Sequence, residues 1–285
     1  MSSPKVWFIT GSSSGFGRAV VEYVLKSGDI AVATLRNPYA LSSLSAVYPA
    51  SKLLVVQLDV SNKPEITVAF AKAVEAFGRV DVVFNNAAYG VLSEAEGARE
   101  EVVRAQFDVD FWGAANVSRE AVRVFREVNS PPGGRILQNG SIAVFRGAPV
   151  LSYYVAAKTA IEGFTKSLAA ELDPEWNIKV TIIEPGGFNT DGAQRSMIRL
   201  PAHPAYTKPG GVPALTRGFL TQPNFKLPGD PTKAAGVIYR VAGIPEPPLQ
   251  FPLGNDCIAM ARDSVNGLTE TIDKYESWSE GLDAE

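Results

Sequence analysis

Three side chains in the middle of the sequence could together move a proton at a carbonyl or alcohol oxygen. Tyr154 and Lys158 are four residues apart in a helical pattern, so they share one face of a helix. An ammonium nearby favours the phenolate, which suits a tyrosine for general acid–base work. Ser141, after an apolar run, could hold the substrate oxygen. Because Tyr-x-x-x-Lys pairs also occur on ordinary surface helices, this chemistry needs a cofactor site beside it.

A glycine-rich turn near the N-terminus is the candidate cofactor site. The first apolar run leads directly into Thr-Gly-Ser-Ser-Ser-Gly-Phe-Gly at residues 10–17, and a helical pattern follows. Glycines at a strand-to-helix turn let the backbone approach a pyrophosphate, and the helix N-terminus adds amide donors. Clustered glycines alone would also fit a flexible loop, but the flanking elements favour a dinucleotide site. Its expected binding residues are Gly11, Ser13, Ser14, Gly15, Phe16 and Gly17.

The end of the second predicted strand indicates which nicotinamide nucleotide is preferred. An NAD enzyme carries an acidic residue about 20 positions after the glycine turn, where it binds the ribose 2′-hydroxyl. Here the strand ends Ala-Thr-Leu-Arg at residues 33–36, with no carboxylate. The planar cation of Arg36 suits a 2′-phosphate, so NADP(H) is expected in preference to NAD(H). If Arg36 is an ordinary solvated residue, the choice of cofactor stays open.

Apolar runs alternate with helical patterns along the chain, which is typical of a parallel α/β sheet. The sequence therefore predicts a Rossmann-type, doubly wound parallel sheet of about seven strands with helices on both faces. The predicted strands are Lys5–Thr10, Ile30–Leu35, Leu53–Asp59, Val80–Asn85, Gly134–Gly140, Lys179–Glu184 and Pro248–Leu253. The predicted helices are Gly17–Lys26, Pro64–Phe77, Arg99–Asn129 and Ser152–Leu172.

One catalytic domain is expected over residues 1–285, with the cofactor bound mainly by residues 1–140 and substrate by residues 141–285. The segment from about residue 190 to 231 is rich in proline and glycine, which predicts a substrate-loop lid. Apolar residues near the site favour a bulky ketone, aldehyde or secondary alcohol, although lid residues packing on the core would look the same. The expected substrate contacts are Ala143, Leu151 and Phe188.

These motifs, in this order, resemble the short-chain dehydrogenase/reductase family over residues 5–190. The matching features are the Gly-x-x-x-Gly-x-Gly turn, Asn-Asn-Ala-Ala at residues 85–88, and Ser141 thirteen residues before Tyr154. The resemblance implies that Tyr154 is the general acid/base and that Lys158 also binds the nicotinamide ribose. By position, the resemblance also implies that Asp59 and Val60 hold the adenine. It implies that Asn86 and Ala87 line the cofactor in a motif that steadies the sheet, and that the turn of Pro185, Gly186 and Thr190 binds the nicotinamide.

One position departs from the family pattern. The family has Asn-x-x-Gly on the helix after the fourth strand, where the asparagine helps a water relay protons, whereas residues 110–113 here read Asp-Phe-Trp-Gly. A charged Asp110 would oppose the phenolate, but a protonated one would mimic the amide. We therefore expect reduced or pH-shifted activity. The alternative is an NADP(H)-binding sensor or partner protein with weak or lost turnover, against which the intact Ser141, Tyr154 and Lys158 argue.

Composition excludes several other functions. The net charge of −3 lacks the basic surface that nucleic acid requires. A single histidine, His203, rules out a histidine-based metal cluster and a Ser-His-Asp hydrolase, so no metal is expected. With one cysteine, an early first strand and no long apolar run, a cytoplasmic protein without membrane contact is expected. From the family resemblance, the helical segments 99–129 and 152–172 imply a homodimer or homotetramer.

Overall fold

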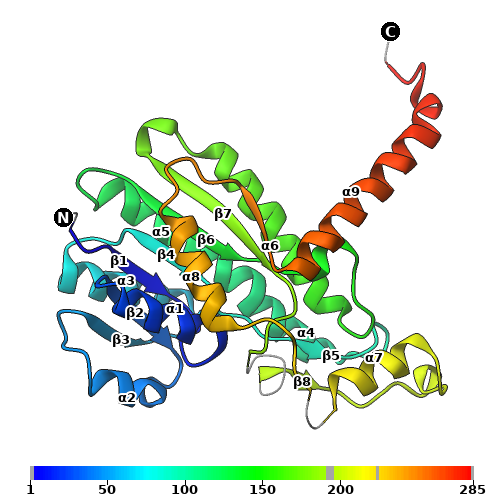
Figure 1. The fold of residues 1–285 in the computed structure, drawn as a ribbon, viewed down its shortest axis with the longest axis horizontal. Helices are drawn as coiled ribbons and strands as arrows, with labels where there is room; N and C mark the ends of the chain where they lie inside the picture. Colours follow the sequence, from blue (N-terminus) through cyan, green and yellow to red (C-terminus); the bar gives the residue numbers. More distant parts are fainter. Residues whose placement is uncertain (1–2, 191–195, 223–224, 284–285) are drawn as a thin grey trace.

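Seven parallel strands form the central sheet, in the order β3-β2-β1-β4-β6-β7-β9 (Figure 1). The computed structural model describes residues 3–190, 196–222 and 225–283. Each predicted strand is confirmed to within two residues at either end. The strands are β1 Val6–Ile9, β2 Ile30–Leu35, β3 Leu53–Gln57, β4 Val82–Asn85, β6 Gly134–Asn139, β7 Ile178–Pro185 and β9 Gln250–Leu253. The central strands β1, β2 and β4 are almost entirely apolar and buried, because helices cover both faces of the sheet.

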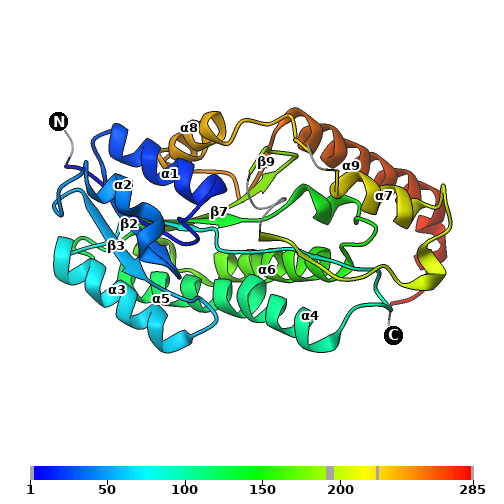
Figure 2. The ribbon, with the colours of Figure 1, turned by 90° about the horizontal axis from the view of Figure 1, so that it is seen from below.

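Helices pack against the sheet from both sides (Figure 2). One face is covered by α1 Gly15–Lys26 and α8 Pro231–Ala242, and the other by α3 Lys63–Phe77, α5 Ala114–Glu127 and α6 Ser152–Glu171. On the first face Val20 and Ile238 meet Ile9, and on the second Phe70 stacks on Phe8 with ring centroids 4.0 Å apart. The shorter helical elements are η1 Pro38–Leu41, α2 Ser42–Ser45, α4 Glu100–Phe107, η3 Ile142–Phe145, η4 Pro174–Trp176, η6 Pro204–Tyr206, α7 Val212–Leu220 and η7 Glu276–Ser279.

The predicted helix Arg99–Asn129 is interrupted. A π-helical turn, η2 Asp108–Gly113, separates α4 from α5. Gly113 lies so close to the loop after β3 that a Cβ there would come within 2.8 Å of the Val60 carbonyl oxygen. A π turn shifts the side chains that follow it around the helix axis and is often found at functional sites. Here the turn contains the buried Asp110.

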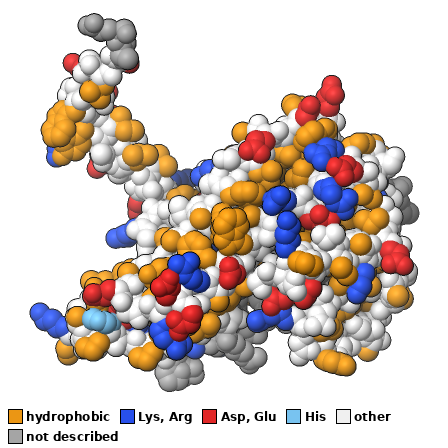
Figure 3. Space-filling view, turned by 180° about the vertical axis from the view of Figure 1, so that it is seen from behind, with side chains coloured by type: hydrophobic (Ala, Val, Ile, Leu, Met, Phe, Trp, Pro, Cys, Tyr) orange, Lys and Arg blue, Asp and Glu red, His pale blue; other side chains and the backbone are white. Residues whose placement is uncertain are grey.

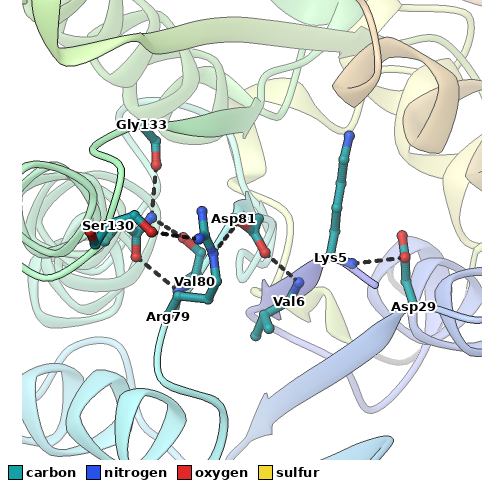
Figure 4. A network of polar contacts seen from close by, with 9 residues as sticks. Lys5, Val6, Asp29, Arg79, Val80, Asp81, Ser130 and Gly133 are labelled. Atoms are coloured by element: carbon teal, nitrogen blue, oxygen red, sulfur yellow. Dashed lines mark hydrogen bonds and ion pairs between the residues drawn. The ribbon is translucent and has the colours of Figure 1, made fainter. Parts of the chain in front are cut away.

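The strand order places the binding crevice. From β1 the chain builds outward to β2 and β3, then crosses to the other side of β1 to form β4. Ligands of such sheets bind at the carboxyl ends of the strands, where the order reverses. At the opposite edge, Figure 4 shows the network that anchors the strand starts, with the Val6 amide donating to Asp81 (2.8 Å), the Lys5 amide to Asp29 (2.9 Å) and Arg79 to Asp81 (2.8 Å).

A second, two-stranded sheet attaches the predicted lid to the body. Strand β5 (Val91–Leu92) pairs in parallel with β8 (Ile198–Arg199). Arg217 of α7 forms an ion pair with Glu94, which is only 3% exposed, with 2.8 Å between Nη2 and Oε2. The sequence did not predict either strand because two residues carry no periodic signal. Residues 191–195 and 223–224 of the predicted lid lie outside the described residues.

The last helix, α9 (Asn255–Tyr275), projects away from the body (Figure 1). It is followed by the short helical turn η7. The C-terminal segment therefore extends outward as a helix. Within the residues that the structure describes, no helix has both the length and the apolar character needed to cross a bilayer.

Candidate active site

The glycine turn forms a tight cradle at the start of α1. Gly11 and Gly15 have φ values of +67° and +54°, which side chains other than glycine's adopt only with strain. At Gly17 a Cβ would come within 2.3 Å of the Gly11 carbonyl oxygen, so no other residue fits there. Ser14 caps α1 in an extended conformation without a side-chain hydrogen bond to the helix amides. The backbone here can therefore approach a pyrophosphate closely, as the sequence predicts.

Thr10 joins this turn to the end of β4. Its hydroxyl oxygen accepts hydrogen bonds from the backbone amides of Asn86 (2.8 Å) and Ala87 (2.9 Å), and the Asn86 side chain donates to the Thr10 carbonyl oxygen (2.9 Å). Asn85 points the other way, into the core, where its amide donates to Gln138 of β6 (2.9 Å). The predicted residues Asn86 and Ala87 thus lie against the glycine turn. Sequence reasoning missed Thr10, although a threonine buried at a strand end is a usable signal.

The predicted adenosine end lies along the neighbouring strands. Arg36 follows β2 directly, is exposed, and forms no ion pair within the described part of the chain. Asp59 and Val60 come just after β3, and the Asp59 carboxylate accepts hydrogen bonds from the Ser61 amide (3.0 Å) and hydroxyl (2.7 Å). The parallel pairing of β2 with β3 brings these strand ends side by side. A guanidinium and a carboxylate are therefore available at adjacent strand ends.

The turn after β7 lies against the glycine turn. Pro185 ends β7, and the Gly186 amide donates to the Leu253 carbonyl oxygen of β9 (2.8 Å). Thr190 lies against the glycine turn, because a Cβ on Gly15 would be only 3.2 Å from the Thr190 Cβ. Phe188 packs edge-on against Phe16 with 5.1 Å between ring centroids. These predicted residues are thus brought together with the glycine turn.

Tyr154 and Lys158 occupy one face of α6, as their spacing predicts. The Lys158 Nζ lies 5.9 Å from the centroid of the Tyr154 ring, and Lys158 is only 2% exposed. Its ammonium donates to the Asn139 carbonyl oxygen at the end of β6 (2.9 Å), an anchor that the sequence did not predict. The Tyr154 hydroxyl has no hydrogen-bond partner among the described residues. By contrast, the Tyr153 hydroxyl donates to the Ala95 carbonyl oxygen (3.3 Å).

Ser141 follows β6 and starts the short helix η3. Its hydroxyl oxygen accepts a hydrogen bond from the Ala143 amide (3.2 Å), which leaves the hydroxyl proton free to donate elsewhere. Ala143 itself is buried in η3, and Leu151 pairs with Ser93 in an isolated bridge just before α6. Two of the three predicted substrate contacts therefore lie on the segment between β6 and α6, and the third, Phe188, follows β7.

Asp110 lies near Lys158 as a buried carboxyl with a raised pKa. It is 1% exposed, and its Oδ1 accepts a hydrogen bond from the Tyr89 amide (3.0 Å). Burial raises the pKa of the Asp110 carboxyl to about 7, although the charge of Lys158 and hydrogen bonds from Tyr89 and Gln106 lower it. Asp110 Oδ2 and Gln106 Oε1 are both buried without a partner. A proton on Asp110 would supply the donor that this pair of acceptors lacks.

Fold and site together define the class of the protein as an oxidoreductase built on a doubly wound parallel sheet. The family model described as short chain dehydrogenase matches residues 5–199, and the chain belongs to this family. It is similar to an uncharacterized oxidoreductase of Schizosaccharomyces pombe, with 38% identity over 93% of this chain and 87% of the relative.

Solved structures agree with this assignment. A short-chain dehydrogenase from Streptomyces avermitilis superposes with a TM-score of 0.86 and 32% identity, over 99% of this chain and all of the other. Two Burkholderia proteins share the fold at lower identity. The Burkholderia cenocepacia protein, in complex with NADP, has a TM-score of 0.72 and 19% identity over 95% and 97% of the two chains. The Burkholderia phymatum protein, in complex with NAD, has a TM-score of 0.74 and 21% identity over 99% of this chain and 98% of the other.

Proposed function

We propose that this protein is an NADP(H)-dependent oxidoreductase that transfers a hydride between the nicotinamide and a carbonyl or secondary alcohol. The observation that carries the proposal is the unpartnered Tyr154 hydroxyl on the same helix face as the buried Lys158 ammonium. A proton donor beside a fixed positive charge suits protonation of an oxygen while a hydride arrives at its carbon. Structures with NADP and with NAD in distant relatives support a nicotinamide cofactor but not the choice between them.

The residues of the crevice fit such a cofactor. The backbone at Gly11, Gly15 and Gly17 would hold the pyrophosphate, because a Cβ at Gly17 would fill the cradle. Thr190 would bind the nicotinamide end, and Arg36 the 2′-phosphate. When bound, the nicotinamide supplies or accepts the hydride.

Each catalytic side chain would have a distinct role. Tyr154 gives its proton to the substrate oxygen during reduction and takes it back during oxidation. Ser141 donates a hydrogen bond to the same oxygen, which holds it near Tyr154. Lys158 has three N–H donors, of which one is used by the Asn139 carbonyl oxygen. The others would bind the nicotinamide ribose, and the positive charge stabilises the phenolate.

Substrate would enter beneath the lid at residues 190–231, beside Ala143, Leu151 and Phe188. The apolar character of these side chains favours a bulky, mostly apolar ketone, aldehyde or secondary alcohol. The ion pair between Glu94 and Arg217 would hold the lid to the body near Leu151, which pairs with Ser93.

The first test is binding and turnover with both reduced nucleotides. Fluorescence quenching on addition of NADPH and NADH measures affinity, and loss of the reduced nicotinamide absorbance reports turnover with a panel of apolar aldehydes and ketones. Tight NADPH binding with turnover supports the proposal. Binding without turnover across the panel favours the sensor, and no binding of either nucleotide contradicts both functions.

Replacing Arg36 with alanine should reduce the preference for NADPH. Charge-assisted hydrogen bonds to a 2′-phosphate contribute about 1.5–3 kcal/mol, so the Kd for NADPH should rise roughly 10- to 100-fold. The Kd for NADH should change less than about threefold, since it lacks the phosphate. Arg104→Ala, an exposed arginine on α4, serves as the control. Equal effects on both nucleotides would show that Arg36 does not select the cofactor.

Asp110 distinguishes the enzyme from the sensor through its pH dependence. With a pKa of about 7, the carboxyl is protonated at lower pH and its charge then no longer competes for Lys158. We expect kcat/KM of the wild type to fall as pH rises through about 7. In Asp110→Asn this decline should vanish, with activity roughly tenfold above wild type well above that pH. Identical profiles for the two proteins would contradict this role.

The same substitution should change stability, independently of catalysis. Burial raises the pKa of Asp110 in the folded protein above its unfolded value of about 3.9. The protonated Asp110 therefore contributes its full stabilisation of the fold at pH values below about 3.9. It is lost as pH rises through the folded pKa of about 7. Asp110→Asn should therefore melt several degrees higher than wild type in alkaline buffer, with the difference shrinking in acid. Thermal melts across this pH range measure it.

A further inference from the structure

Helix α9 presents an apolar face that the described chain leaves exposed, apart from the Trp278 ring, which packs edge-on against Tyr275 with 5.1 Å between ring centroids. Its first turns pack against η3 and β9, where Cys257 is fully buried, but every residue from Val265 to Tyr275 is exposed. Figure 3 shows this end of the chain standing clear of the body with hydrophobic side chains on its surface. The exposed apolar residues of α9 are Ile258, Val265, Leu268, Ile272 and Tyr275.

These residues follow the seven-residue spacing of a coiled coil. Ile258, Val265 and Ile272 are seven apart and occupy the first position of three successive heptads. Three residues after each of them, the fourth position holds Ala261, Leu268 and Tyr275. All three first positions are β-branched, and the fourth positions hold alanine, leucine and tyrosine, so one apolar seam runs along the helix. The sequence of α9 is thus suited to packing against one other helix.

A helix of this kind gains little from standing alone in water. Isolated helices shorter than about 12–15 residues are marginal in water, and the fully exposed part of α9 spans only residues 265–275. Gly267, in the middle of that part, costs helix stability. Most helix stability in proteins comes from packing an apolar face, so a partner helix is the missing contribution.

We propose that α9 pairs in an antiparallel arrangement with α9 of a second copy of this chain. In the register that aligns the two seams, Val265 of each copy faces Leu268 of the other, and Ile258 faces Tyr275 of the partner subunit. The twofold axis then passes between residues 266 and 267. Such an interface is closed and self-complementary, which is the usual symmetry of homodimers.

Charges flanking the seam favour this direction. In the antiparallel register, Arg262 and Glu276 of the partner subunit lie on the same flank, about 7 Å apart along the helix axis, a separation that long side chains span in coiled coils. The twofold symmetry of the dimer forms this ion pair twice. Neither residue has an ion-pair partner within the described part of its own chain. A parallel pair would instead place Arg262 beside the buried Cys257, with no acidic partner.

This interface differs from the one that the family resemblance implies. That expectation places the contact on the long helices of residues 99–129 and 152–172, which lie against the sheet. The proposed contact uses only the projecting helix. A substitution on the exposed end of α9 therefore changes the proposed interface without touching the core.

Sedimentation equilibrium of the full chain, with and without a seam substitution, tests the proposal. The wild type should be a dimer. Leu268→Glu should raise the dimer Kd roughly 100-fold or more, because two carboxylates would enter the apolar seam. Asn266→Glu adds the same charge off the seam and should change the Kd by less than about threefold. A wild type that is monomeric at about 100 µM, or equal effects of the two variants, would overturn the proposal.

A charge exchange tests the antiparallel register. Arg262→Glu and Glu276→Arg should each raise the dimer Kd roughly five- to tenfold, by replacing attraction with repulsion. The double variant should recover to within about twofold of wild type, because the pairs re-form with the charges exchanged. Arg262 lies in α9 and Glu276 is its C-cap, roughly 21 Å away along the helix axis, so recovery must come from the partner. Additive losses in the double variant would rule out this register.

Discussion

Replacing Tyr154 with phenylalanine is expected to reduce kcat for NADPH-dependent carbonyl reduction by roughly 10²- to 10⁴-fold, the usual contribution of a positioned general acid. The substitution removes one hydroxyl that has no partner among the described residues, so the fold loses no hydrogen bond there. The ring that faces Lys158 remains. NADPH binding should therefore stay within about threefold of wild type, and the loss should appear in turnover. Fluorescence titration and steady-state kinetics measure the two effects.

The neighbouring tyrosine provides a matched control for this prediction. Tyr153→Phe removes a hydroxyl from the same helix, where it donates to the Ala95 carbonyl oxygen on another face. We expect kcat to change by less than about fivefold, since a hydrogen bond of this kind contributes about 1 kcal/mol. Comparable losses in both variants would mean that Tyr154 acts through packing and is not the proton donor.

Replacing Gly17 with alanine is expected to abolish dinucleotide binding, with the Kd for NADPH raised at least about 100-fold. The added Cβ would lie 2.3 Å from the Gly11 carbonyl oxygen and 2.8 Å from the Asn86 side-chain nitrogen. Relieving these contacts requires the turn to open away from the end of β4, which would displace the amides that face the pyrophosphate. Isothermal titration with NADPH measures the loss.

The control for the glycine substitution lies on another helix. Gly163, on α6, has nothing within 4 Å of an added Cβ. Gly163→Ala should leave NADPH affinity unchanged and raise stability by about 0.5–1 kcal/mol, because alanine is the better helix former. Thermal melts of both variants separate a local effect on the cradle from a loss of the fold. Full affinity in a folded Gly17→Ala variant would disprove the role of this cradle.

Local sequence patterns determined the strands of the main sheet, the glycine turn and the Tyr154–Lys158 pair. Apolar runs predicted all seven strands of the main sheet, because strands covered on both faces must be apolar throughout. The glycine turn and the four-residue spacing of Tyr154 and Lys158 are also local features, and the structure places both at the carboxyl ends of the strands. The catalytic and cofactor roles assigned to these residues stay predictions until the variants are measured.

Only the tertiary structure decided the environment of Asp110 and the attachment of the lid. The π turn that interrupts the predicted helix 99–129 buries Asp110, and burial, which no local pattern encodes, raises the pKa of its carboxyl. The ion pair of Glu94 with Arg217 joins residues 123 positions apart. Contacts of this kind depend on which segments meet after folding. Periodicity in the sequence records which face of an element is buried, whereas the partner of that face, and the charges it brings, exist only once the chain has packed.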